Sequence, residues 1–368
     1  MRAGLAGLAA ALLALLALPA AAETLRLATF NADLTRNGPG LLLQDLQRGT
    51  SKQVVAVLDV VAAANPDVLL LTGFDWDYQG LALAAFEAAL AARGAGYGYL
   101  YAPRSNAGLP TAFDINGDGR LGGPRDAQGY GRFSGEGSMA LLSRLPIITE
   151  QARDFSGFLW RDLPDNLLAG AGLAPEIVSS LRLSSMGHWD VPLRLPGGGA
   201  LHVLAFMATP PVFDGPEDLN GRRNHDEAAF WLRLLEGRLP WPAPPAPFVL
   251  LGDANLDPAD GEGRREALRA LLVHPALQDP APRSAGGVAA AAAQGGENLA
   301  QAGDPALDTV DWAESGDLGN RRVDYVLPSA GLGVLASGVF WPAPGEPHAE
   351  AAQAASRHRL VWVDIALP

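Results

Sequence analysis

The sequence predicts an α/β protein in which two β-sheets pack face to face and helices cover their outer sides. Segments with strand periodicity alternate with segments of helical periodicity along the chain. Their spacing is too irregular for a single doubly wound parallel sheet, so two packed sheets with outer helices fit better. The chain has 368 residues, of which 48% are hydrophobic and 18% charged, and this composition supports a large core.

The first half of the chain supplies four clear elements. Residues 24–31 (TLRLATFN) alternate apolar and polar side chains and predict a strand. Residues 51–65 carry apolar side chains at helical spacing, and Pro66 ends that helix. Residues 67–71 (DVLLL) form a wholly apolar run, typical of a strand buried on both faces. Residues 81–92 predict a helix that glycines end.

The second half continues the alternation. A long glycine-rich loop lies between predicted strands at 98–101 and 139–142. Residues 284–303 are rich in Ala, Gly and Gln and predict a surface loop. The pattern contains no internal repeat and no linker, which predicts one domain. The remaining predicted strands are 201–207, 248–251, 323–327, 331–340 and 359–365, and the remaining helices are 224–236 and 264–272.

The N-terminus has the features of an export signal. Arg2 precedes an uninterrupted run of Leu, Ala and Gly at 5–18, then Pro19 and three alanines at 20–22 follow. We therefore predict a signal peptide at 1–22, cleavage near Ala22, a mature domain at 23–368 and a secreted or periplasmic location. The alternative is an uncleaved membrane anchor, although the run is short for a span. No other stretch is long and apolar enough to cross a bilayer.

Charge and composition narrow the classes of ligand. The formal net charge is −13, which opposes non-specific nucleic-acid binding because phosphate affinity depends on Lys and Arg. Nucleic acid is therefore not expected as a partner, and the expected ligand is a small phosphoester or another, unknown ligand. The absence of cysteine excludes disulfides, thiolate metal sites and cysteine nucleophiles. The sequence leaves the oligomeric state open.

Polar side chains follow several predicted strands. In GDANLDP (252–258), Asp253 and Asn255 stand two residues apart directly after an apolar strand and share a face in extended geometry. A carboxylate beside an amide oxygen suits a metal-bound phosphate or its attacking water. Such pairs are also common as turn residues. Similar strand-end groups are Asn31, Asp324 in RVDYVL, and His358 in SRHRL.

Together and in this order, these motifs resemble the endonuclease/exonuclease/phosphatase superfamily, in a bacterial secreted branch. The resemblance covers nearly the whole mature chain and implies a four-layered αββα sandwich of two mixed sheets with outer helices. It places an active site at one edge of the paired sheets. The other matching stretches are ATFNADLTRN (28–37), NPDVLLLTGFDWD (65–77), DINGDGRLGGPRDAQGYGRF (114–133), GHWDVPL (187–193) and TPPVFDGPEDLNGRRNHDE (209–227).

The resemblance implies metal-dependent phosphoester hydrolysis. By position, Asn31 matches a metal-side residue, and Asp253 and Asn255 match the pair that places the nucleophile. Asp324 matches a further acid, and His358 matches the His of the final strand. These matches imply a Mg²⁺ or Mn²⁺ site at Asn31 and Asp253, and catalytic roles for His358, Asp253, Asn255 and Asp324.

Other family positions depart from the pattern. Gly73 stands where the metal-binding Glu is expected, Met207 where a phosphate-facing His is expected, and Arg357 where the acidic partner of the terminal His is expected. Gly137 aligns near an expected Tyr. We therefore expect a degenerate site with hydrolysis lost or strongly impaired; the alternatives are an active phosphoesterase with a rearranged site and a purely structural, calcium-bound protein.

We have two further expectations for the side chain of Arg357. We expect its charge to disfavour protonation of His358. We also expect its guanidinium to reach Asp253 or Asp324 and to occupy the place of a metal, where it would bind substrate.

A separate pattern resembles the first half of a calcium loop. Asp114, Asn116 and Asp118 alternate and a glycine follows, so their oxygens and the carbonyl of Arg120 predict a structural Ca²⁺ site, completed by Asp126. The alternative is an Asx-turn loop held by its own backbone hydrogen bonds. Two polar clusters, 188–190 and 222–225, either border the active-site cleft or are structural.

Overall fold

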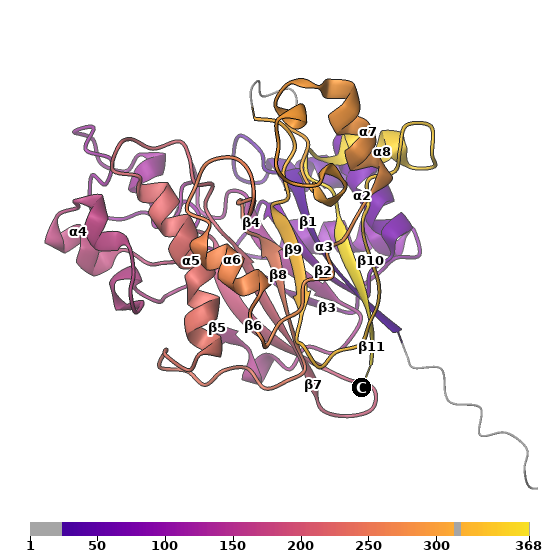
Figure 1. The fold of residues 1–368 in the computed structure, drawn as a ribbon, viewed down its shortest axis with the longest axis horizontal. Helices are drawn as coiled ribbons and strands as arrows, with labels where there is room; N and C mark the ends of the chain where they lie inside the picture. The colour runs from indigo at the N-terminus through magenta and orange to yellow at the C-terminus, as the bar shows by residue number, and fades with distance from the viewer. Residues whose placement is uncertain (1–23, 313–317, 368) are drawn as a thin grey trace, which may run out of the picture.

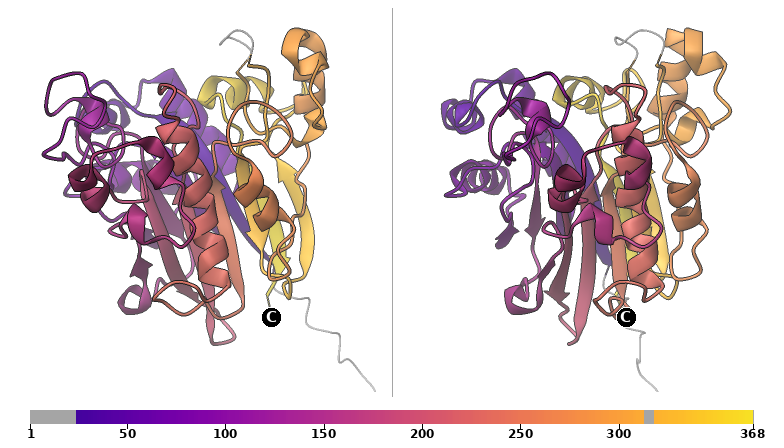
Figure 2. Two further views of the ribbon diagram at one scale, coloured as in Figure 1. Left: turned by 60° about the vertical axis from the view of Figure 1, so that its left-hand side comes forward. Right: turned by 90° about the vertical axis from the view of Figure 1, so that its left-hand side faces the viewer.

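A computed structural model describes residues 24–312 and 318–367. It contains two mixed sheets that pack face to face, with helices on both outer sides (Figures 1 and 2). The predicted four-layered αββα sandwich is confirmed. The predicted signal peptide lies outside the described residues. Among the described residues, no helix has the length and hydrophobicity needed to span a bilayer.

The first sheet has six strands in the order β10-β11-β1-β2-β4-β3. Its central strand β2 is buried along its whole length, as the apolar run at 67–71 predicts. β1 pairs with β2 in parallel and with β11 antiparallel. The strands are β1 (Thr24–Leu34), β2 (Val68–Phe74), β3 (Tyr99–Tyr101), β4 (Ser138–Ser143), β10 (Val334–Val339) and β11 (Val361–Ala366).

The second sheet has five strands in the order β5-β6-β7-β8-β9. β7 and β8 run parallel, so their carboxyl ends meet at one edge of the sheet, where Met207 lies opposite Asp253. The strands are β5 (Arg153–Asp154), β6 (Gly187–Arg194), β7 (Ala200–Met207), β8 (Phe248–Asp253) and β9 (Asp324–Pro328).

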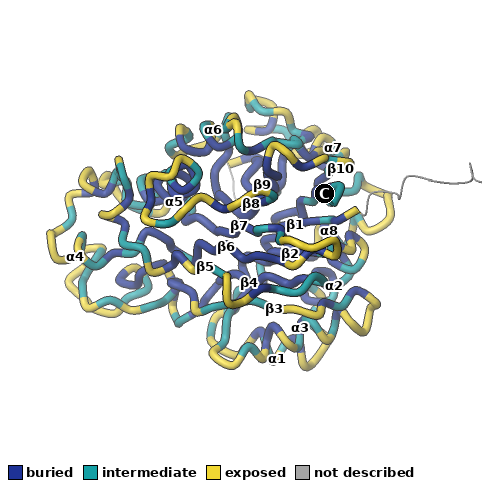
Figure 3. The backbone as a smooth tube through the Cα atoms, turned by 90° about the horizontal axis from the view of Figure 1, so that it is seen from below, coloured by how far each residue is buried: buried dark blue, intermediate teal, exposed yellow. Residues whose placement is uncertain are grey.

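Helices cover each sheet on its outer side, and Figure 3 looks along the layers. α1 (Leu41–Arg48), α2 (Lys52–Ala64), α3 (Leu81–Ala91) and α8 (Ala349–Ala355) pack on the first sheet. α5 (Leu219–Leu235) and α6 (Glu266–Leu272) pack on the second, and α4 (Pro175–Ser180) lies near its edge. The short 3₁₀ helices are η1 (Pro124–Asp126), η2 (Thr149–Gln151), η3 (Trp160–Asp162), η4 (Leu168–Ala171), η5 (Gly296–Leu299) and η6 (Pro305–Leu307).

The core divides into three apolar layers. One lies between the sheets and combines residues from β1, β2 and β4 with residues from β6, β7 and β8. The other two lie between each sheet and its helices. Burial of these apolar surfaces provides the main driving force for the fold.

The prediction of a surface loop at 284–303 is wrong. Residues Ala285–Gln294 form α7, and the Ser284 side chain accepts a hydrogen bond from the Gly287 amide at its start. A Cβ at Gly286 would collide with the backbone and ring of Trp341. The glycine therefore lets this helix approach the chain closely, and a composition typical of a loop serves packing instead.

Candidate active site

Strand ends from both sheets bring the predicted polar residues together. Asn31 lies in β1, Asp253 ends β8, Asp324 begins β9, and His358 precedes β11. The amide Nδ2 of Asn31 donates to Asp253 Oδ2 over 2.9 Å and lies 3.4 Å from His358 Nε2. Residues far apart in the chain thus form one buried polar cluster, as the motifs predict.

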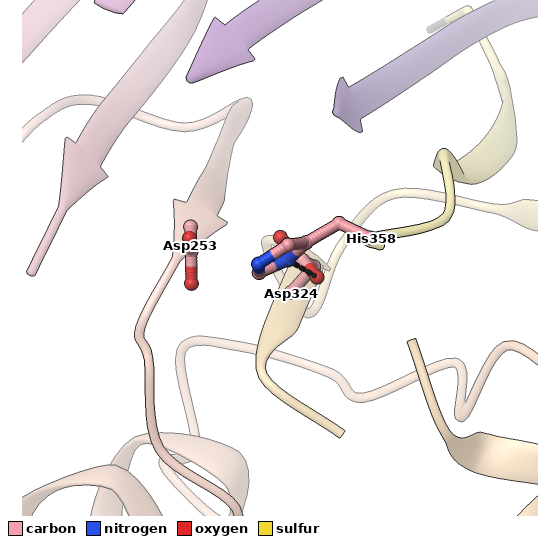
Figure 4. A group of neighbouring side chains, drawn as sticks. All are labelled: Asp253, Asp324 and His358. Atoms are coloured by element: carbon pink, nitrogen blue, oxygen red, sulfur yellow. Dashed lines mark hydrogen bonds and ion pairs between the residues drawn. The ribbon is translucent and has the colours of Figure 1, made fainter. Parts of the chain in front are cut away.

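His358 and Asp324 form a buried pair, and Figure 4 shows their contact. His358 Nδ1 lies 2.9 Å from Asp324 Oδ2, and their side chains are 5% and 0% exposed. The hydroxyl of Thr309 donates to the same Asp324 oxygen over 2.8 Å. Burial alone would lower the pKa of His358, but Asp324 and Asp253 outweigh it and raise the pKa to about 9.

Asp253 lies beside this pair and is fully buried. Its Oδ1 accepts the backbone N–H of Asn255 over 2.8 Å, while Oδ2 accepts from Asn31. Burial and the nearby Asp324 charge raise the pKa of Asp253 to about 7. The Asn255 side chain donates to the carbonyl of Ala208 over 2.9 Å and so joins the ends of β7 and β8.

A cleft of about 1230 Å³ opens over this cluster. Asn31, Asn255 and His358 line one part of it. Apolar side chains, including Met207, Val212 and Phe213, form much of the remaining wall. The cleft is large enough for a drug-sized ligand, since such pockets usually measure about 300–1,000 Å³.

Comparisons with known proteins identify the family that has this architecture. The model of the Endonuclease/Exonuclease/phosphatase family matches residues 28–358. The chain belongs to the endonuclease/exonuclease/phosphatase family. A search of curated proteins gave no match.

Solved structures support the family's fold. A family protein from Beutenbergia cavernae is similar with a TM-score of 0.54 and 20% identity, over 94% of this chain and 72% of that one. A second, from Leptotrichia buccalis, has a TM-score of 0.50 and 15% identity, over 93% of this chain and 100% of that one. At these identities the likeness shows the fold alone.

Gly73, where the sequence resemblance implies a metal-binding Glu, has no room for a side chain. Gly73 has a φ of 64°, a left-handed conformation that favours glycine. A Cβ built there would collide with Oδ1 of Asn31 and lie 3.3 Å from the amide of Asp33. The amide of Asn31 therefore fills the space in which a family carboxylate would begin.

Arg357 does not behave as predicted. Its guanidinium pairs with Asp33, with 3.2 Å between Nε and Oδ2, rather than with Asp253 or Asp324. The expectation that the acidic partner of His358 is lost is also wrong, because Asp324 fills that role. The raised pKa of His358 further contradicts the expected effect of Arg357, since buried carboxylates dominate its surroundings.

Met207 and Gly137 both line the cleft. Met207 ends β7 beside Asp253, so the position expected to hold a phosphate-facing His presents a thioether. Gly137 has a φ of 58°, and its amide donates to Asp75 over 2.9 Å. Burial raises the pKa of Asp75 to about 6, and its two backbone hydrogen bonds show a structural role.

Family membership implies a divalent metal, and the predicted Asn31–Asp253 site does not fit one. Oδ1 of Asn31 accepts from the Asp33 amide, its Nδ2 faces Asp253, and Asp33 is paired with Arg357. Mg²⁺ and Mn²⁺ favour oxygen ligands, usually including a carboxylate. Among the described residues, only Asp253, Asp324 and His358 form a group of three candidate ligands. A cation there would compete with the proton of His358.

The predicted calcium loop is held by its own hydrogen bonds. Asp114 accepts from the amides of Asp118 and Gly119, and Asp118 accepts from the amide of Arg120. The side chain of Asp126 accepts from the amides of Ile115 and Gly123. This is the geometry of the Asx-turn alternative, and Ca²⁺ binding by Asp114, Asn116, Asp118, Arg120 and Asp126 stays a prediction.

The two other polar clusters are now placed. His188 is buried between Ser184 and the carbonyl of Glu227, and burial lowers its pKa to about 4, so it is structural. Asn224 donates to the carbonyls of Thr209 and Ala254 and supports both loops of the cleft. Arg223 lines the cleft, whereas Arg222 is not among the lining residues and donates to the carbonyls of Glu217 and Leu167.

Sequence reasoning missed three supporting residues. Asp33 holds Arg357, Thr309 holds Asp324, and the Ser356 hydroxyl donates to the Asn31 carbonyl over 2.7 Å. Asp33 and Ser356 stand within two residues of predicted site residues, and that proximity could have identified them. Thr309 comes from a distant segment, and no local pattern marks it.

Proposed function

We propose that this protein is an exported member of its family that binds small phosphoesters in the cleft but has lost most of the metal-dependent hydrolysis. The observation that carries the proposal is the geometry at Gly73. The missing carboxylate cannot return there without displacing Asn31, whose amide is bonded to Asp253. The space expected to hold a metal-binding carboxylate is thus occupied by the side chain of Asn31, which is hydrogen-bonded to Asp253.

A second feature supports impaired hydrolysis. Met207 replaces a group expected to face the phosphate, whereas the acidic partner of His358 is retained as Asp324. Removing one transition-state donor typically costs about 10²–10³ in rate. The combined loss is not additive, but each change removes a different part of the shared mechanism.

Phosphoester binding has its own support. A protonated His358 offers an N–H donor and positive charge at the cleft floor, and Asn31 and Asn255 add amide groups. Charge-assisted hydrogen bonds of this kind favour phosphate oxygens. The net charge of −13 makes nucleic acid an unfavourable ligand, so we propose small molecules.

Turnover of bis(p-nitrophenyl) phosphate and p-nitrophenyl phosphate tests the catalytic half of the proposal. The purified protein is assayed with Mg²⁺, Mn²⁺, Ca²⁺ or EDTA, beside His358→Ala prepared in the same way. We expect the two proteins to show the same background rate under every condition. Metal-dependent turnover that disappears in His358→Ala would overturn this half.

The alternative is an active, divalent-metal-dependent phosphodiesterase or phosphatase of the cell exterior or periplasm. The intact Asp324–His358 pair favours it, because a carboxylate that orients a His is a common catalytic arrangement. The group Asp253, Asp324 and His358 would then supply the ligands or the acid–base chemistry. The same assay separates the two functions.

Binding and export need separate measurements. Calorimetry with methylphosphonate tests ligand binding, and we expect His358→Ala to abolish it.

Calcium uptake that is lost in Asp118→Ala would support a calcium-bound loop. Export from 1–22 is tested by the N-terminal mass of protein recovered from the producing cells, where cleavage near Ala22 is the expected result and an intact N-terminus would contradict it.

A further inference from the structure

Arg223 is a buried cation that borders the cleft. It lies in the second turn of α5, its residue surface is 7% exposed, and it is among the residues that line the cleft. Burial lowers the pKa of its guanidinium, although a guanidinium remains charged at neutral pH. A buried charge is costly unless a partner of opposite charge compensates it.

The direct contacts of Arg223 do not neutralise that charge. Nη1 donates to the carbonyl of Gln128 over 2.8 Å, and Nη2 donates to the carbonyl of Arg182 over 3.2 Å. The guanidinium also lies 5.0 Å from the ring centre of Trp160. Among the described residues, Nε has no hydrogen-bond partner, and no carboxylate forms an ion pair with Arg223.

Two other buried arginines, Arg322 and Arg359, differ from Arg223 because each forms an ion pair with a carboxylate. Arg322 pairs with Asp279, and Arg359 pairs with Asp311. The acid that most affects Arg223 is Glu227, one helical turn further along α5. The Glu227 carboxylate accepts instead from the amide and hydroxyl of Ser185 and from the amide of Thr209, at 2.6–2.7 Å.

Several acids that line the cleft form contacts with other groups. Asp33 pairs with Arg357 and Glu136 with Arg132, while Asp257 accepts three backbone amides. Apolar groups surround this part of the cleft, including Ala127, Leu173, Leu181 and Met186. A guanidinium without an ion-pair partner beside apolar side chains can fix the acidic group of an otherwise apolar ligand.

We propose that Arg223 forms a second anion-binding position in the cleft, separate from the Asn31–His358 position. The ligand class is a small molecule with two anionic groups joined by an apolar spacer. Its phosphoester lies at Asn31 and His358, and a carboxylate or second phosphate pairs with the guanidinium of Arg223. This inference rests on the proposed phosphoester binding, because the same ligand occupies both positions.

A series of alkane-α,ω-diphosphonates tests the proposal, because these probes cannot be hydrolysed. Their affinities are measured by calorimetry in EDTA and compared with methylphosphonate. We expect one spacer length to bind at least about tenfold more tightly than methylphosphonate, since a second charge-assisted contact adds to the first. Equal affinity at every spacer length would overturn the proposal without any variant.

Variants of Arg223 test whether this residue causes the gain in affinity for the diphosphonate. Arg223→Met removes the charge but keeps an apolar stem, and we expect it to bind the best diphosphonate only as tightly as methylphosphonate. Arg223→Lys keeps the charge and should retain most of the gain. Arg222→Met is the matched control, because this neighbour lies on the same helix outside the cleft, and it should bind like the wild type.

The outcomes separate this inference from the proposed function. If His358→Ala abolishes methylphosphonate binding but Arg223→Met leaves the diphosphonate gain intact, phosphoester binding stands and the second position falls. If the wild-type protein binds none of the probes, both fall. Circular dichroism and thermal unfolding of each variant verify folding. If Arg223→Lys folds like the wild type but shows no gain in affinity for the diphosphonates, this result also counts against the second position.

Discussion

The site contains two ion pairs that are formed by adjacent residues but differ in burial. His358 points inward to Asp324, with side chains 5% and 0% exposed, whereas Arg357 points to Asp33 at the rim, with side chains 59% and 28% exposed. The two adjacent side chains point in different directions, so one step along the chain separates a buried pair from a half-exposed one. This difference predicts that a change of charge at position 357 leaves the His358–Asp324 pair intact.

The energetic consequences of the two pairs differ accordingly. Removing one partner of a buried pair leaves an uncompensated charge in a medium of low dielectric constant. Removing one partner of a rim pair leaves a charge that water can solvate. Variants that break each pair in turn measure this contrast.

The largest effect is expected for Asp324→Ala. The change leaves His358 without its partner and Thr309 without an acceptor, and it should lower the free energy of unfolding by about 3–5 kcal/mol. Urea unfolding of the purified proteins measures the loss. A loss no greater than that of a rim variant would show that burial does not distinguish the two pairs.

The buried pair should also give a pH signature. Because the folded-state pKa of His358, about 9, exceeds its ordinary value of 6.5, its stabilisation is complete below that ordinary value and is lost as pH rises through the folded pKa. In EDTA, the stability difference between wild type and Asp324→Ala should therefore shrink as the pH rises from about 6 to about 9.5. A difference that grows over this range would contradict the assignment.

Gly73 lies between the two pairs, and Gly73→Ala should cost about 2–3 kcal/mol. The cost combines a left-handed φ with the collision against Asn31. Gly80→Ala is the matched control, because Gly80 has a φ of 68° but nothing within 4 Å of a built Cβ. Equal losses in urea unfolding would show that Asn31 does not fill the space beside Gly73.

The fold could be predicted from sequence because its signals are local. The apolar run of β2 and the Ser51 cap and Asn65 end of α2 each depend on neighbouring residues. The glycines of α7 misled the prediction because their role depends on Trp341, which is distant in the chain. Local patterns report backbone preference, whereas close approach of two segments is a property of the folded molecule.

The site was predicted in part for the same reason. Strand-end motifs correctly brought Asn31, Asp253, Asp324 and His358 together, because strands direct their ends to one edge. The partners of Arg357 and His358 were assigned wrongly, since each partner comes from another strand or loop. Which carboxylate faces which cation depends on side-chain direction, and residue order does not specify that direction.

The smallest effect is expected for Asp33→Asn, at less than about 1 kcal/mol. His358 and Arg357 hold the pKa of Asp33 below its ordinary value against the opposing effect of burial, so the carboxylate is charged at neutral pH. The substitution removes that charge while Asn can still accept from Ser356 and the Arg357 amide. The loss should shrink further in about 0.5 M NaCl, because salt screens a rim pair. If Asp33→Asn instead destabilises the protein as much as Asp324→Ala, the rim pair is part of the buried cluster and the division of the site between 357 and 358 is wrong.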